Sequence, residues 1–277
     1  MSSSLQAVFQ TRYSFFGQSG WRSDTSKAQE LLFDPERLNK RLDLFLKMNL
    51  ACLRDQSDPD FKLVVLTSSL LPQDHLKLLT EACHDVIGKK RAHVIARAPG
   101  SAGRWLQKFT QRRLNTHSHS AQIVLDDDDA VSVDFVESCK REGEFALSRF
   151  RDDQDCVYLS YATGMTARFE DDGITLMPRV VPFTNLGLAL VAPTDTSKNP
   201  YMLAHKKVAR RHAVRVNYDQ RPYYIRAVHD SNDSRAMHDD VALSAEAIEK
   251  AMPYFPLLKD LTVKVPAEAE ASPSSAA

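Results

Sequence analysis

A hydrophobic stretch of this sequence runs directly into four consecutive carboxylates: Ile123, Val124 and Leu125 precede four aspartates at positions 126–129. The apolar residues are typical of a buried strand, but four adjacent like charges cannot stay in a core without partners. The sequence therefore predicts a strand that ends at the rim of a sheet and presents its carboxylates there. In open α/β sheets, ligands bind at the carboxyl ends of the strands.

The carboxylate cluster is suited to a hard divalent cation that offsets the repulsion. Mg²⁺ and Mn²⁺ prefer oxygen ligands and usually share their coordination sphere with substrate phosphates. Most acidic runs are solvated turns, and this alternative stays open. An ordinary turn does not need a Val-Leu strand before it, and for this reason we favour a metal site.

The sequence has no net charge that would attract nucleic acid, because its 36 basic and 36 acidic residues cancel. Cys52, Cys83 and Cys139 fall among apolar positions of expected helices, and we predict that they are buried free thiols. No apolar run approaches the roughly 20 residues of a membrane-spanning helix. The first residues lack the basic and apolar regions of a signal peptide. We expect a cytoplasmic protein and leave a peripheral membrane association open.

An alternation of strands and helices predicts the architecture of the first half. Strands are expected at 7–16, 61–67, 92–96 and 122–125, and helices are expected to begin near residues 34, 72, 101 and 132. This order is typical of a mainly parallel sheet with helices on both faces. After residue 155 the expected elements are short strands, at 157–161, 165–170, 174–178, 186–191, 213–218 and 223–228, with one helix at 201–212. We predict an α/β fold: a doubly wound, mainly parallel sheet extended by a mixed or antiparallel C-terminal part.

We expect one domain in two halves, residues 1–145 and 146–235, followed by an extension at 236–277. From about residue 267 the sequence is rich in Ala, Glu, Ser and Pro and low in complexity. Such segments cannot bury enough apolar surface to fold, so a disordered tail is expected there.

The absence of several common motifs lowers the expectation for the classes that carry them. The sequence has no P-loop, no GxGxxG after the first strand and no GxSxG. P-loop NTPases, classical Rossmann dehydrogenases and α/β-hydrolases are therefore disfavoured. Two single residues remain ambiguous on spacing alone. His229 fits an oxygen-rich metal site, although a surface histidine is the preferred interpretation, and Arg12 suits a phosphate or a structural ion pair equally well.

Five blocks of the sequence, in order, resemble the bacterial rhamnosyltransferase family within the GT-A glycosyltransferases. They are QTRYS (10–14), LFDPERL (32–38), DPDFKLVVLTS (58–68), LDDDDA (125–130) and RPYYIRAVHDSN (221–232). One acidic pattern arises easily by chance, whereas five ordered blocks spanning roughly residues 8–235 are much more specific. The resemblance implies a nucleotide-sugar-dependent transferase, with residues 1–145 as the nucleotide-sugar half and 146–235 as the acceptor side.

The resemblance also implies roles for the residues of the acidic stretch. As the family's DxD motif, it would place Asp126 and Asp128 on Mg²⁺ or Mn²⁺, which would hold the donor diphosphate and stabilise the leaving group. Asp127 is implied at the donor as well. GT-A enzymes often use a histidine near the end of the core as a further ligand, which favours His229.

Other residues are candidates for contacts with the donor or the acceptor. The resemblance implies that Thr11 and Arg12 face the nucleotide, and Arg104 is a candidate for the donor sugar or phosphate. The general base is unassigned, with Asp172 and Asp219 as candidates.

Three functions remain open. The leading hypothesis is transfer of a sugar, with rhamnose suggested by the family, from a dTDP- or UDP-sugar donor to a glycan or glycolipid acceptor. A metal-dependent nucleotidyltransferase would use the same carboxylates but release free diphosphate. A non-catalytic module would use the acidic loop to bind calcium or a basic partner.

Overall fold

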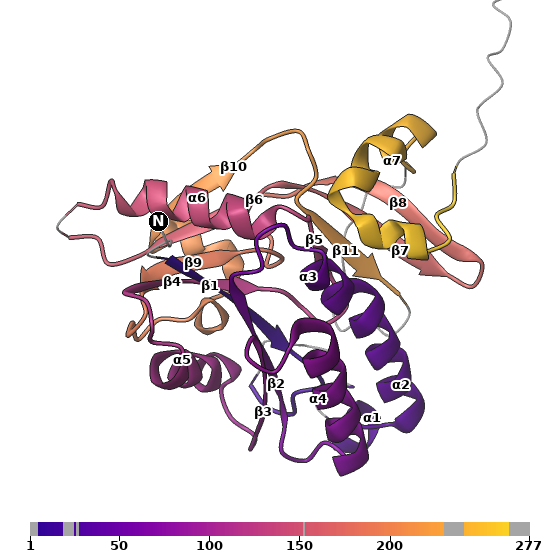
Figure 1. Cartoon of the computed structure of the whole chain (residues 1–277), viewed down its shortest axis with the longest axis horizontal. Coiled ribbons are helices and arrows are strands. Elements are labelled where there is room, and N and C mark those ends of the chain that lie inside the picture. The colour runs from indigo at the N-terminus through magenta and orange to yellow at the C-terminus, as the bar shows by residue number, and fades with distance from the viewer. Residues whose placement is uncertain (1–4, 19–24, 26–27, 152, 230–240, 266–277) are drawn as a thin grey trace, which may run out of the picture.

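The structure, a computed structural model, describes residues 5–18, 25, 28–151, 153–229 and 241–265 (Figure 1). A seven-stranded sheet of order β10-β6-β9-β4-β1-β2-β3 forms its centre. The strands are β1 (Leu5–Arg12), β2 (Phe61–Ser68), β3 (Ala92–Arg97), β4 (His119–Val124), β6 (Val157–Tyr161), β9 (Ala189–Pro193) and β10 (Ala213–Asn217). β3, β2, β1 and β4 are mutually parallel, and β9 runs antiparallel between β4 and β6.

Helices cover both faces of this sheet, with α5 on one side of β2 and β3 and α4 on the other (Figure 1). The helices are α1 (Gln29–Leu32), α2 (Pro35–Leu44), α3 (Ala51–Arg54), α4 (Gln73–Ile87), α5 (Ala102–Arg113), α6 (Phe135–Leu147) and α7 (Ala245–Ala251), with a π-helical segment η2 (Phe45–Leu50) between α2 and α3. Alternate residues of β1 face opposite sides of the sheet and pack against different layers of helices. Val8 lies in a core cluster with Leu106 of α5, whereas Phe9 lies in the larger core with Cys83 of α4.

The start of α2 shows how the sequence sets a helix boundary. The Asp34 side chain accepts a hydrogen bond of 2.9 Å from the Arg37 backbone N–H, and Pro35 occupies the first helical position. Both features satisfy or remove backbone donors that a helix N-terminus leaves open. The predicted helix start is confirmed here.

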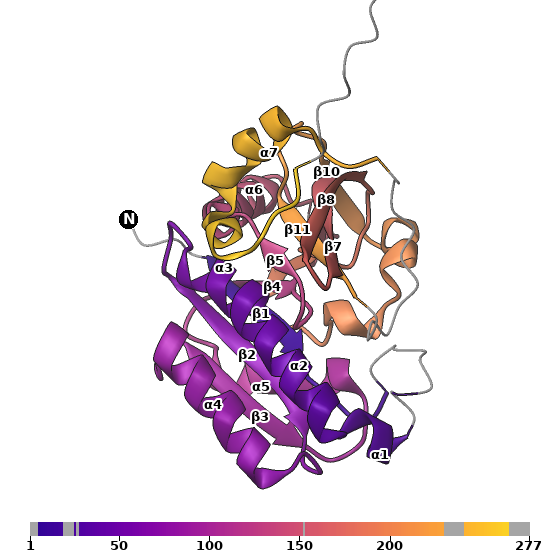
Figure 2. The same cartoon turned by 90° about the vertical axis from the view of Figure 1, so that its right-hand side faces the viewer.

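A second sheet of order β5-β11-β7-β8 lies beside the first. Its strands are β5 (Ala130–Val131), β7 (Thr163–Glu170), β8 (Gly173–Val180) and β11 (Tyr224–Val228). One face of this sheet shares its core with α7 and two short 3₁₀-helices, η5 (Met252–Tyr254) and η6 (Pro256–Asp260). Figure 2 shows α7 against this sheet, at the opposite end of the molecule from β3.

The predicted fold class is confirmed as α/β with a mainly parallel sheet. The C-terminal part extends that sheet through β9, β6 and β10, and it also builds the second sheet, which we did not predict. The predicted thiols Cys52, Cys83 and Cys139 are buried and free, as is Cys156. In the described ranges, no helix is long and apolar enough to cross a membrane.

The predicted helix at 201–212 is wrong. Two 3₁₀-helices, η3 (Pro200–Met202) and η4 (His205–Arg210), stand there, and extended backbone at Leu203 and Ala204 separates them. Tertiary contacts explain the break. The Tyr201 hydroxyl donates to the Gln10 carbonyl at 2.8 Å, which anchors η3 on β1. The predicted tail from residue 267 lies outside the described residues, and the division at residues 145 and 235 stays a prediction.

Candidate functional site

The four aspartates follow β4 at the carboxyl ends of the central parallel strands, as the sequence predicts. β4 ends at Val124, and the Leu125 backbone N–H donates to the Gln10 carbonyl of β1 at 3.2 Å. The chain then passes through residues 126–129 to β5, which belongs to the second sheet. The acidic loop, residues 126–129, therefore connects the two sheets.

Asp126 is held by Arg12, the last residue of β1. The Arg12 Nη2 donates to Asp126 Oδ1 at 2.6 Å, and the guanidinium carbon lies 4.4 Å from the centre of the Tyr201 ring. Arg12 is buried, whereas the Asp126 side chain keeps 26% of its surface exposed. The structure thus brings together two predicted site residues. The partly exposed Asp126 carboxylate lies between the buried Arg12 guanidinium and solvent.

Asp127 is buried against Arg41 of α2. Arg41 Nε donates to Asp127 Oδ2 at 3.0 Å, and Arg41 Nη2 donates to Asp127 Oδ1, so the pair is bidentate. Desolvation by burial raises the pKa of Asp127 to about 6, against the attraction of Arg41. Both oxygens of this predicted donor-binding residue are therefore engaged by the protein itself.

Asp128 faces His229, which follows β11. Asp128 Oδ2 lies 3.0 Å from His229 Nε2 and 3.9 Å from Arg41 Nη1. Burial alone would raise the pKa of Asp128, but Arg41 and His229 lower it to about 2. Asp128 is consequently a carboxylate throughout the neutral range.

Asp129 binds the second sheet. Its Oδ1 accepts a hydrogen bond of 3.0 Å from the Ala227 backbone N–H in β11, and burial raises its pKa well above the ordinary value. Each of the four side chains therefore has a protein partner, and these partners offset part of the repulsion. The expected divalent cation stays a prediction.

Sequence reasoning missed Asn49, which supports the loop from the π-helical segment η2. The fully buried Asn49 Nδ2 donates to the Thr11 hydroxyl at 3.3 Å and to the Asp126 carbonyl at 3.0 Å. π-Helical turns frequently occur at functional sites, because the extra residue redirects side chains. The signal in the sequence was one amide inside the apolar run Met48–Cys52.

The Asp128–His229 pair has a spacing that suits a metal ion. The observed separation of 3.0 Å is that of a hydrogen bond, and it also matches the distance of about 3.0 Å between two adjacent ligands of an octahedral ion with bonds of about 2.1 Å. Across the described part of the chain, no three His, Cys, Asp or Glu side chains gather closely enough to hold a metal. Two protein ligands suffice for Mg²⁺ or Mn²⁺ when phosphate and water fill the other positions. The residues therefore fit such an ion.

The remaining predicted residues lie apart from these contacts. Arg104 is exposed in the first turn of α5. Asp172 is 78% exposed in the β7–β8 turn, where it pairs with Lys264. Asp219 is exposed after β10, where it accepts a hydrogen bond of 2.7 Å from the Tyr223 hydroxyl. The described contacts of Asp172 and Asp219 do not include the acidic loop.

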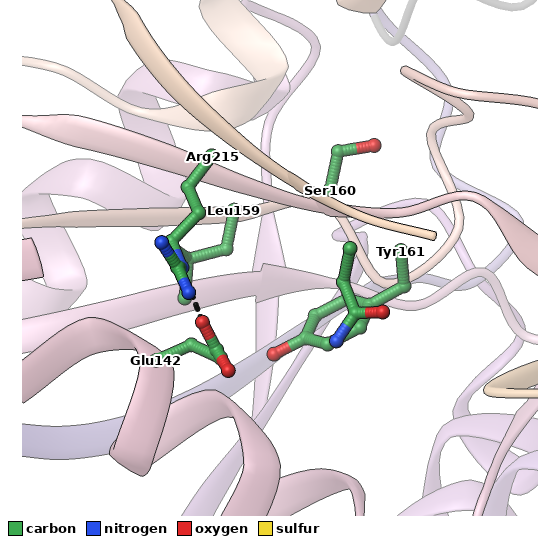
Figure 3. Close-up of a pocket in the computed structure, with 6 residues that line it drawn as sticks. Glu142, Leu159, Ser160, Tyr161 and Arg215 are labelled. Carbon is green, nitrogen blue, oxygen red and sulfur yellow. Dashed lines mark hydrogen bonds and ion pairs between the residues drawn. The ribbon is translucent and has the colours of Figure 1, made fainter. Parts of the chain in front are cut away.

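A small pocket lies elsewhere, between α6, β6 and β10 (Figure 3). Glu142 and Arg215 form an ion pair across it, and Tyr161 lies beside them. None of its lining residues is a predicted site residue. The acidic loop remains the candidate site.

Comparisons with known proteins identify the family. The model of a family described as "Putative rhamnosyl transferase" matches residues 6–240. No curated protein matches the sequence. Similar solved structures include S. aureus TarS 1-349, with 11% identity and a TM-score of 0.41, over 80% of this chain and 60% of that one. Another, described as a "putative nucleotide-diphospho-sugar transferase" from Desulfovibrio desulfuricans G20, has 11% identity and a TM-score of 0.36, over 82% of each chain.

A third solved structure, the inositol-1-phosphate CTP transferase from T. maritima, has 10% identity and a TM-score of 0.33, over 95% of this chain and 100% of that one. The chain spans 60% of the length of the TarS 1-349 chain. Because the family model covers most of the chain, the chain belongs to the family described as "Putative rhamnosyl transferase".

Proposed function

We propose that this protein is a glycosyltransferase that moves a sugar, rhamnose being the one that the family name suggests, from a dTDP- or UDP-sugar to a glycan or glycolipid acceptor. We further propose that it depends on Mg²⁺ or Mn²⁺ bound by Asp128 and His229, with Asp126 as a third ligand that moves closer when the ion binds. The observation that supports this is the Asp128–His229 pair, because its 3.0 Å separation suits one octahedral ion at the carboxyl ends of β1 and β4.

The bound ion would supply positive charge next to the diphosphate leaving group. Asp128, with a pKa of about 2, stays ionised and available as a ligand at neutral pH. Asp126 uses only Oδ1 for Arg12 among its described contacts, and its partial exposure leaves Oδ2 for a ligand. Asp126 would therefore approach the ion without giving up Arg12.

Two predicted donor-binding residues take supporting roles in this proposal. Asp127 has both oxygens on Arg41 and is 1% exposed, so it fixes the loop instead of contacting the donor. Thr11 is fully buried and accepts from Asn49, which also holds the Asp126 carbonyl. The second sheet also holds the acidic loop in place, since Asp129 accepts a hydrogen bond from the β11 backbone next to His229.

The test is a melting-temperature screen against UDP, GDP, dTDP and CMP, each with and without Mn²⁺. A ligand at a hundred times its dissociation constant adds about 2.7 kcal/mol to the free energy of unfolding. We expect a shift with dTDP or UDP that requires the metal. No shift with any nucleotide would contradict the proposal.

The products of the reaction separate this function from nucleotidyl transfer. Incubation with the dTDP- or UDP-sugar that stabilises the protein should release nucleoside diphosphate. Release of free diphosphate from a nucleoside triphosphate would instead identify a nucleotidyltransferase.

A further inference from the structure

A short basic segment beside the candidate site carries four exposed cations: Lys206, Lys207, Arg210 and Arg211. Val208, between them in sequence, is fully buried in a core cluster with Tyr158 and Leu190. The buried valine fixes the segment to the protein, and the charged side chains remain in solvent. In the part of the chain that the structure describes, none of these four side chains forms a hydrogen bond or an ion pair.

Some surface lysines elsewhere form ion pairs along a helix. Lys40, Lys47 and Lys250 each pair with a carboxylate four residues away, at 2.6–2.8 Å. In the basic segment, Lys207 and Arg210 are three residues apart in the 3₁₀-helix η4, where side chains at this spacing are neighbours, and they carry the same sign. The chain has no net charge, so this concentration of cations is local.

Two histidines lie at the ends of the segment, and burial mainly lowers the pKa of each, with smaller contributions from nearby cations. The pKa of His205 is lowered by burial, with Lys206 contributing. The pKa of His212 is lowered by burial, and Lys198 and Arg211 contribute. An unbalanced positive surface of this kind attracts an anionic partner.

The segment adjoins the candidate site. Tyr201 of η3, four residues before His205, packs on Arg12, which holds Asp126. The His205 ring contacts the Phe183 carbonyl, and Asp126 influences the His205 pKa. Met202 lies between Tyr201 and His205 in the sequence, and its apolar side chain is 41% exposed.

We propose that the basic surface, formed by Met202, Lys206, Lys207, Arg210 and Arg211, binds the phosphate headgroups of an anionic membrane. Clusters of about four to eight Lys and Arg residues on an amphipathic helix bind acidic lipids through the negative surface potential of the bilayer, and η4 likewise buries Val208 and exposes its cations. An adjacent apolar side chain adds contact with the acyl boundary, and Met202 supplies it. Docking of this surface would bring a membrane close to the acidic loop. The inference does not depend on the proposed sugar transfer.

The test is sedimentation of the full chain with phosphatidylcholine vesicles that contain or lack phosphatidylglycerol. We expect binding only to the anionic vesicles, and weaker binding as salt is added. Replacing the four cations together by Gln should reduce binding by at least about tenfold. The matched control replaces four paired surface lysines by Gln, which changes the net charge equally and should leave most of the binding. Its positions are Lys40, Lys47, Lys77 and Lys250.

Three outcomes would overturn the proposal: no binding to anionic vesicles, an equal loss in the control variant, or displacement by inorganic diphosphate beyond the effect of ionic strength. The last result would identify a site for a soluble phosphate compound. The nucleotide melting screen on the variant with the four Gln residues keeps the two proposals distinct. A preserved shift with lost vesicle binding supports the membrane surface.

Discussion

Arg41 of α2 and Asp127 of the acidic loop, 86 residues apart in sequence, form a bidentate ion pair whose side chains are 4% and 1% exposed. The pair joins a helix on one face of the sheet to the carboxyl end of β4. The third nitrogen of Arg41 lies 3.9 Å from Asp128 Oδ2, so one cation also acts on the proposed metal ligand. The geometry of the loop therefore depends on α2 as much as on the strand that precedes it.

Removing Arg41 should destabilise the fold strongly, because it leaves Asp127 buried without a counter-charge. We expect Arg41→Met to reduce the free energy of unfolding by about 3–5 kcal/mol, measured by urea denaturation. Adding Asp127→Leu should restore much of this loss, since no uncompensated charge then remains. A single variant as stable as the wild type would contradict the assignment of a buried, ionised pair.

Asp128→Asn should leave the fold intact and abolish nucleotide binding that depends on metal. Arg41 and His229 lower the pKa of Asp128, so the folded protein favours its charge, and the melting temperature without ligand should be equal or modestly lower. The metal-dependent shift with nucleotide should disappear, as measured in the same melting screen. Asp153→Asn, in an exposed pair with Arg151, is the matched control and should keep the shift. Equal shifts in Asp128→Asn and the wild type would exclude Asp128 as a ligand.

The features that the sequence predicts correctly depend on local patterns. The apolar run before the acidic loop indicates β4 and its end at the sheet rim, and Asp34 with Pro35 indicates the start of α2. Alternation of strands and helices then limits the first half to a mainly parallel sheet. Each of these inferences uses residues that are neighbours in the chain.

The partners of the carboxylates could not be predicted in the same way. Arg12 and Asp126 are 114 residues apart, and Asp128 and His229 are 101 apart. Arg41 follows Lys40 on an amphipathic helix, and nothing in its residue type separates a buried cation from an exposed one. The second sheet is similar, because the pairing of β11 with β5 and β7 joins distant segments whose register only the folded chain determines.

Replacing Asn49 should weaken nucleotide binding at the acidic loop as well as lower the stability of the fold. Asn49→Leu removes the hydrogen bonds to Thr11 and to the Asp126 carbonyl, at a cost of about 1–3 kcal/mol. It should also weaken nucleotide binding, measured as a higher dissociation constant by calorimetry. Gln56→Leu is the matched control: Gln56 is buried and bonds the carbonyls of Cys52 and Ser132 outside the loop. Equal effects of both variants on nucleotide binding would refute a specific role for Asn49.

His75 should make the fold less stable in acid. It is 7% exposed and its Nε2 lies 2.7 Å from the Tyr13 hydroxyl, and burial lowers its pKa below the ordinary value. The unfolded chain therefore binds a proton near pH 6.5, about the ordinary pKa of histidine, before the folded protein does. The stabilisation is complete above this pH and is lost as the pH falls through the lower pKa of the folded state. We expect His75→Gln to flatten the decline of unfolding free energy between neutral and mildly acidic pH, measured by urea denaturation across that range. Parallel curves for the variant and the wild type would show that His75 keeps its ordinary pKa in the folded protein.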